Sequence, residues 1–129
     1  MGMYTGLRGF VKFKEEYVSD IQCYMKRGVE DWYDLRQIHS VVSFRAFATD
    51  ERSMFIPFGA VCYMPDEWGA SRCAFEDDTM SFTCSLKNYD RTIEKFLACL
   101  PDIAYEWRLE KLYEEDSDIT LFTSEVIDD

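Results

Sequence analysis

The chain has 129 residues, of which 25 are acidic and 14 basic, so its formal net charge at pH 7 is −11. Its length fits one domain with its own core, and its 47% hydrophobic and 16% aromatic content excludes wholesale disorder. No apolar run approaches the roughly 20 residues that cross a bilayer, and the start lacks the apolar stretch of a secretory signal. We therefore expect a single cytoplasmic domain over residues 1–129 and no membrane partner.

The N-terminal part of the sequence predicts a strand and then a helix. Residues 7–13 are rich in aromatic and β-branched side chains beside two cations, which is typical of a strand. Gly6 and Gly9 could permit a bulge or a close backbone approach at its start. From residue 15 to residue 27, apolar side chains recur every three or four positions, which places them on one face of a helix.

The middle of the chain is less regular. Residues 29–39 could form a short second helix with Trp32 on its apolar side. Residues 41–48 and 54–64 predict two further strands, and Pro57 would bend or interrupt the second of them. A polar segment between these two strands predicts a turn.

A hairpin is expected next, because residues 73–77 and 80–86 flank Asp78 and Thr79. A turn centred there would pair Phe75 with Phe82 and Cys73 with Cys84, with all four side chains on one face. The chain has five cysteines and no Cys-x-x-Cys pair, so we expect reduced core thiols with neither a disulfide framework nor a zinc site.

The last third predicts a helix over residues 88–100, capped by Asn88 or Asp90 and stopped by Pro101. A strand follows in which Tyr105, Trp107 and Leu109 are buried and Glu106, Arg108 and Glu110 point outward, and residues 119–126 predict a final strand. Together the elements predict an α+β fold, a twisted antiparallel sheet of five to seven strands with two main helices packed on one face.

No catalytic, metal or cofactor motif is complete in this sequence. The one histidine, His39, has no nucleophile signature near it, so we predict no enzyme. Asp116 and Asp118 begin like a calcium loop, but Leu121 stands where that loop needs glycine. The glycines at 6 and 9 lack the lysine of a P-loop, although backbone N–H groups and Arg8 there could meet an anion.

Negative charge is concentrated at the C-terminal end, where the last 29 residues hold ten carboxylates and two cations. Alternate strand residues lie about 7 Å apart on one face, so Glu106, Glu110 and Glu114 would form a row that resembles the phosphates of a nucleic acid. Such a field attracts a basic partner and repels nucleic acid itself. We predict that this row binds a basic, nucleic-acid-processing protein, with further contacts from Asp116, Asp118, Trp32 and Tyr113.

Two short blocks of the sequence resemble small acidic proteins of phages and bacteria. They are Tyr4-Thr5-Gly6-Leu7-Arg8-Gly9 and Ser85-Leu86-Lys87-Asn88-Tyr89-Asp90, and the second leads into Thr92-Ile93-Glu94. This resemblance implies an inhibitor of host defence, of the anti-CRISPR or anti-restriction type. An immunity protein for a cationic nuclease toxin would use the same physics. The alternative from another class is a small enzyme or an anion- or nucleotide-binding domain, with a pocket between sheet and helices near Arg8, Arg45 and Tyr63. The last strand could also form a homodimer by edge pairing.

Overall fold

The computed structural model describes residues 4–27, 41–50, 53, 55–58, 72–88, 91–113, 115 and 118–124. The predicted second helix at 29–39 lies outside these residues. Within them the chain forms, in order, β1 (Thr5–Phe13), α1 (Glu15–Arg27), α2 (Val42–Ala48), α3 (Phe55–Phe58), β2 (Arg72–Glu76), β3 (Thr79–Leu86), α4 (Thr92–Ile103), β4 (Ala104–Tyr113) and β5 (Thr120–Thr123).

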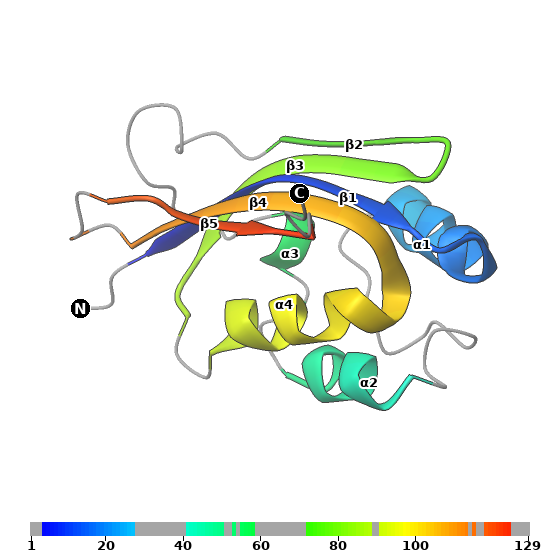
Figure 1. Ribbon diagram of the computed structural model, residues 1–129, viewed down its shortest axis with the longest axis horizontal. Helices are drawn as coiled ribbons and strands as arrows, with labels where there is room; N and C mark the ends of the chain where they lie inside the picture. The colour runs from blue at the N-terminus through cyan, green and yellow to red at the C-terminus, as the bar shows by residue number, and fades with distance from the viewer. Residues whose placement is uncertain are drawn as a thin grey trace, which may run out of the picture.

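The five strands form one antiparallel sheet in the order β2-β3-β1-β4-β5 (Figure 1). β1 is the central strand, paired with β3 on one side and β4 on the other, and β2 and β5 are the edges. The predicted α+β class, with an antiparallel sheet of five to seven strands and two main helices packed on one face, is confirmed, and the described residues form five of these strands.

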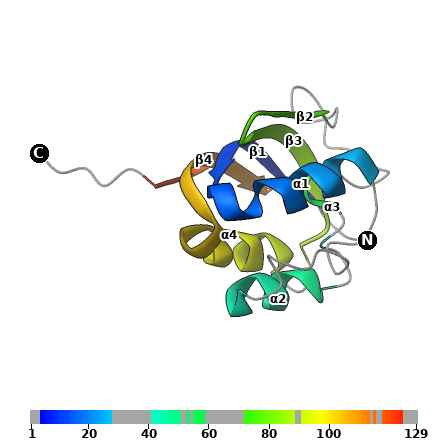
Figure 2. The ribbon, with the colours of Figure 1, turned by 90° about the vertical axis from the view of Figure 1, so that its right-hand side faces the viewer.

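The helices lie on one side of the sheet, which we call the inner face. Figure 2 shows α1 and α4 below the strands and α2 on the far side of α4. Two aromatic contacts join these layers: the Phe47 ring of α2 lies 5.2 Å from the Phe96 ring of α4, which in turn meets Phe82 of β3 at 6.4 Å between ring centroids. Among the described residues, no helix is long and apolar enough to cross a membrane.

Two segments predicted as strands are helical where the structure describes them. Residues 42–48 form α2, because Phe44, Phe47 and Ala48 are buried at the three- and four-residue spacing of a helix. The β-branched residue Val42 favoured a strand, but its side chain is 69% exposed and does not determine the packing. Of the predicted strand 54–64, residues 55–58 form the short helix α3, interrupted at Ile56, where the backbone is extended. A short apolar run does not distinguish a strand from a buried helical turn.

The β2–β3 hairpin forms with a register that differs by two residues from the prediction. Its turn is Asp77–Asp78, so Cys73 pairs with Phe82 and Phe75 with Met80. Asp77 has a φ of 59°, a left-handed conformation that aspartate adopts more readily than most residues. A shift of two residues keeps every side chain on its face. The predicted shared face of the cysteines and phenylalanines is therefore correct, whereas the direct pairing of Cys73 with Cys84 is wrong.

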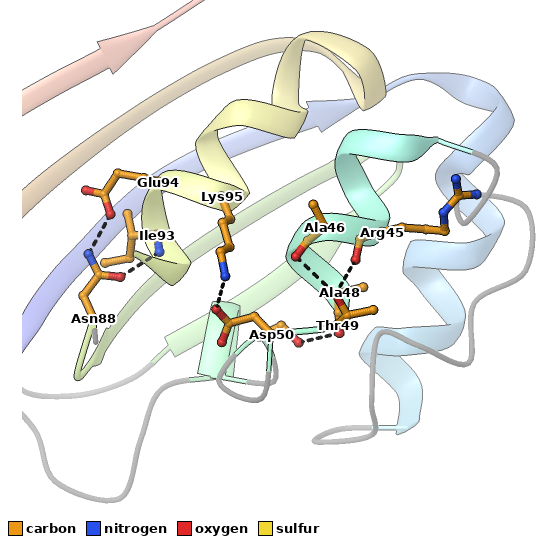
Figure 3. Close-up of polar contacts among 10 residues, drawn as sticks. Arg45, Ala46, Ala48, Thr49, Asp50, Asn88, Ile93, Glu94 and Lys95 are labelled. Atoms are coloured by element: carbon orange, nitrogen blue, oxygen red, sulfur yellow. Dashed lines mark hydrogen bonds and ion pairs between the residues drawn. The ribbon is translucent and has the colours of Figure 1, made fainter. Parts of the chain in front are cut away.

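Helix α4 begins at Thr92, four residues later than predicted, and ends at Ile103, three residues later than predicted; its N-cap residue is Arg91, which makes no side-chain capping bond. Asn88, one of the two predicted caps, still bonds to the first turn. The Asn88 Oδ1 atom accepts a hydrogen bond from the Ile93 backbone N–H at 2.9 Å, and its Nδ2 atom donates to Glu94 at 2.8 Å (Figure 3). Pro101 does not stop the helix; it lies inside the last turn, which continues to Ile103. The buried side chain of Ile103 packs into the core and favours this extra turn.

The buried carboxylate of Asp50, two residues after α2, forms an ion pair with a lysine of α4. The Lys95 Nζ atom lies 2.9 Å from Asp50 Oδ2, and the Asp50 side chain is only 1% exposed (Figure 3). The segment predicted as a simple polar turn thus holds a paired, buried acid. Such pairs fix the relative placement of elements more than they raise stability.

The end of β4 nearest α4 departs from simple alternation. Lys12 pairs with Glu106 whereas Phe13 pairs with Ala104, so Tyr105 is an extra residue in β4. Ala104 is buried and Tyr105 is 61% exposed, contrary to the predicted burial of Tyr105. Beyond this bulge the alternation is as predicted, with Leu109 buried and Glu106 and Arg108 exposed.

A second polar contact ties β4 to α4 on the inner face. The Lys111 Nζ atom lies 2.5 Å from Glu94 Oε2, while Asn88 donates to the other oxygen of the same carboxylate. Burial raises the pKa of Glu94, but the hydrogen bonds from Lys111 and Asn88 outweigh burial, so the pKa lies below its usual 4.5. The ionised carboxylate of Glu94 therefore ties β4 to α4.

This contact predicts a loss of stability in acid. Because the pKa of Glu94 is lower in the folded state, its contribution is complete above about pH 4.5 and is lost as the pH falls through the folded pKa. Glu94→Gln should lower the free energy of unfolding at pH 7 by up to about 1 kcal/mol, since the pair is partly exposed. Urea unfolding should show the difference from the parent shrinking toward pH 3. Lys111→Met should behave alike, and a difference independent of pH would contradict this account.

Candidate functional site

The side of the sheet opposite the helices, which we call the outer face, presents an ordered set of side chains. Strand pairing arranges them in three rows across the strands, which are Arg72-Thr83-Arg8-Glu110-Leu121, Ala74-Ser81-Phe10-Arg108-Thr123 and Glu76-Thr79-Lys12-Glu106. Neighbours within a row lie about 5 Å apart and successive rows about 7 Å apart. The first two rows hold three arginines and one carboxylate, whereas the third holds one lysine and two carboxylates. Charge therefore changes sign along the outer face.

The first two rows surround a hollow of about 550 Å³. Arg8, Arg72, Arg108, Phe10, Ser81 and Thr83 are among the residues that line it. The Arg8 Nε atom donates to Glu110 Oε1 at 2.7 Å, with both side chains about a quarter to a third exposed. Within the part of the chain that the structure describes, Arg72 and Arg108 are exposed and have no ion-pair partner. Two guanidinium groups thus remain available beside one that is already held in place.

Gly9 sets the floor of this hollow. Its φ is 140°, a conformation that residues with side chains rarely adopt. A Cβ atom here would lie 2.0 Å from the Arg108 carbonyl oxygen, so only glycine allows β1 and β4 to approach as they do. The close backbone approach expected from the sequence is confirmed at this residue. It places Phe10 and Arg108 opposite one another on the two strands.

The chemistry of the hollow suits anion binding better than proton transfer. Guanidinium groups stay charged at all ordinary pH values and donate hydrogen bonds in a planar fork that matches phosphate and carboxylate oxygens. The hydroxyl groups of Ser81 and Thr83 can add further hydrogen bonds. Burial raises the pKa of the nearby Cys73 thiol to about 12, which leaves it protonated and a poor nucleophile.

The structure disperses the residues predicted to bind a basic partner. Glu106 is exposed on the outer face opposite Lys12, and Glu110 is paired with Arg8. Tyr113 ends β4 and is 39% exposed, and Asp118 is exposed before β5. The remaining predicted contacts, Glu114, Asp116 and Trp32, lie outside the described residues.

The described part of the predicted acidic row along β4 has the expected spacing, but its charge is partly neutralised by the neighbouring strand. Glu106, Arg108 and Glu110 do share one face, yet the neighbouring strand β1 places a cation opposite each of the two acids. Opposite charges directly across a strand pair attract each other and reduce the field that reaches a partner. The acids of β4 therefore belong to a surface of mixed charge, because the cations of β1 lie beside them.

Sequence reasoning missed Arg72, Arg108 and Phe10 as members of one site. Alternation within residues 7–13 already separates Arg8 and Phe10 from the buried Leu7 and Val11, which was an available signal. The predicted hairpin already places β2 next to β3, but no local signal indicates that this hairpin pairs with β1, which brings Arg72 into the same row as Arg8. The expected pocket between sheet and helices is not where the hollow lies: the hollow is on the outer face, Arg45 belongs to α2 on the inner side, and Tyr63 lies outside the described residues.

The glycines at the start of β1 do not form a backbone anion cradle. Gly6 and Gly9 are within β1, which is paired on both sides, so their backbone polar groups face neighbouring strands. The part of the expectation that concerns Arg8 still applies, because that side chain lines the hollow. An anion would meet side chains here, not main-chain N–H groups.

No group of three or more His, Cys, Asp or Glu side chains within the described residues is arranged to hold a metal ion. Comparisons of the chain with protein-family models, with curated proteins and with solved structures found no match.

The conformation of Gly9 gives a test of this site's framework. Gly9→Ala should lower the free energy of unfolding by roughly 2 kcal/mol or more, because the Cβ meets backbone and the positive φ is strained. Thermal and urea unfolding would measure the loss. Ser81→Ala, an exposed change on the neighbouring strand, should alter stability by no more than about 0.5 kcal/mol. Equal stability of Gly9→Ala and the parent would show that β1 and β4 do not approach this closely.

Proposed function

We propose that this protein is a small-ligand-binding domain of the cytoplasm that takes up an anion in the hollow on the outer face of its sheet. The observation that carries the proposal is the convergence of Arg8, Arg72 and Arg108 from three different strands on one hollow. In a chain of net charge −11, three arginines at a single concave surface favour a specific role over general solubility. The volume lies within the range of small-molecule sites.

The side chains that line the hollow support binding without catalysis. The carboxylate of Glu110 is engaged by Arg8 and is suited to orient that guanidinium group. The other polar groups that line the hollow are guanidinium groups, hydroxyl groups and the Cys73 thiol, whose pKa burial raises to about 12, and none of them acts as a base near neutral pH. We therefore propose that the domain binds and releases its ligand unchanged.

The proposal is tested by titrating the full chain with inorganic pyrophosphate and following the backbone amide signals by NMR. Signals of Arg8, Phe10, Arg72 and Arg108 should shift, and added salt should weaken binding. Arg72→Gln with Arg108→Gln should weaken binding about tenfold or more, because each charge-assisted hydrogen bond is worth about 1.5–3 kcal/mol. Arg45→Gln, an exposed arginine on the inner side, is the matched control and should bind like the parent. No shift at the outer face at millimolar pyrophosphate would refute the proposal.

A second candidate, the acidic inhibitor of a basic nucleic-acid-processing protein, is favoured by a different surface. The β2–β3 turn lies beside the end of β1, since the Phe13 backbone N–H donates to the Asp78 carbonyl at 2.9 Å, and α1 begins two residues later. Six carboxylates gather around this point, where Lys12 and Lys14 also lie, and form what we call the acidic end, namely Glu15, Glu16, Glu76, Asp77, Asp78 and Glu106. The proposed contact surface thus moves from the length of β4 to this end of the sheet. An immunity protein for a cationic nuclease would use the same surface.

The second candidate predicts that Glu76→Lys with Glu106→Lys abolishes capture of a basic nuclease or helicase from a bacterial lysate at low salt, while melting temperature changes little. Both residues are exposed, so folding should tolerate the change. Glu115→Lys with Asp118→Lys, two exposed acids beyond β4, is the control and should retain capture. Capture that survives the reversal at the acidic end, or that does not weaken with salt, would exclude this surface.

A further inference from the structure

We propose that the ligand of the outer-face hollow is a nucleoside monophosphate, with its base stacked on Phe10 and its phosphate held by arginines. This inference rests on the proposed anion-binding function and adds the class of ligand. It follows from one feature that anion binding alone does not require. An aromatic ring lies on the central strand, between the arginines and within the same hollow.

Phe10 is placed as a platform and not as a core residue. It is on the outer face of β1, only partly buried, with the exposed Ser81 opposite it on β3 and the exposed Arg108 opposite it on β4. Burying a large apolar side chain is favourable, so a phenyl ring left at the centre of a charged face is a surface that a planar apolar group can cover. Open antiparallel sheets use aromatic side chains in this way to stack single bases.

The arginines surround this ring at distances that suit one nucleotide. Arg8 is two residues from Phe10 on the same strand, about 7 Å away, and Arg108 is directly across on β4, about 5 Å away. Arg72 approaches from β2 in the same row as Arg8. A base above Phe10 therefore leaves its phosphate within reach of these long side chains. Ser81 and Thr83 can bond the edge of the base or the ribose hydroxyl groups.

The charge around the hollow favours a single nucleotide over a nucleic-acid strand. The third row on the same face carries Glu76 and Glu106, and the one cation between them is Lys12, beside the neutral Thr79. On the other side the hollow meets Glu110, which already pairs with Arg8. A longer chain of phosphates would extend over these acids and be repelled by a protein of net charge −11. One phosphate held by the arginines stays clear of the third-row acids, and the charge of Glu110 beside it is offset by Arg8.

The test compares four probes on the full chain by isothermal titration at low salt: adenosine 5′-monophosphate, ribose 5-phosphate, adenosine, and a ten-nucleotide single strand of deoxyadenosine. The monophosphate should bind at least tenfold more tightly than ribose 5-phosphate, because the base adds a stacking contact. Phe10→Leu keeps an apolar side chain but removes the aromatic face, and should cancel that tenfold advantage. Phe10→Tyr should retain it. Melting temperatures of both variants establish that they fold.

Each outcome separates this inference from the broader proposal. Equal affinity for adenosine 5′-monophosphate and ribose 5-phosphate would overturn the nucleotide assignment and leave anion binding intact. An advantage that persists in Phe10→Leu would also overturn it, since the base would then bind elsewhere. Binding of the ten-nucleotide strand more than tenfold tighter than the monophosphate would replace a mononucleotide with a nucleic-acid strand. Failure of both phosphates to bind at millimolar concentration would refute anion binding itself.

Discussion

The pairing of β1 on both sides is the constraint on which the rest of this structure depends. β1 joins the β2–β3 hairpin to β4 and β5, although all four of these strands lie far from β1 in the sequence. Its contact with β4 requires Gly9, because any side chain there would collide with the Arg108 backbone. A central strand is satisfied on both edges, so its alternating residues supply the middle of the core on one face and the middle of the candidate site on the other.

The two faces of the sheet are formed by alternate residues of the same strands but have different physical roles. On the inner face the side chains of Leu7 and Val11 are fully buried in the core, and removing such apolar surface from water is the dominant favourable term in folding. On the outer face Arg8 and Phe10 alternate with them and are held in place by the same backbone. Side chains on a sheet held by a packed core are displayed with fixed spacing, which is what binding a small ligand requires.

The helices and strands with strong periodicity could be predicted from sequence, whereas weaker segments could not. The helix at residues 15–27 and the strand at 7–13 have clear patterns, and both are found. The residue types of segments 42–48 and 55–58 predict strands, but these segments are helical where they pack against α4 and β3. The hairpin register depended on which aspartate adopts a positive φ, and neighbouring aspartates give no local reason to choose.

The sequence by itself determined the class of the fold and the alternation that sends Arg8 and Phe10 to one face of β1 and Leu7 and Val11 to the other. Only the tertiary structure decided which charges become neighbours. Strand order places Arg8 opposite Glu110 and Lys12 opposite Glu106, and it brings Arg72 to the same face. Electrostatic character is a property of groups close in space, so an acidic row along one strand became, across five strands, a basic hollow beside an acidic end.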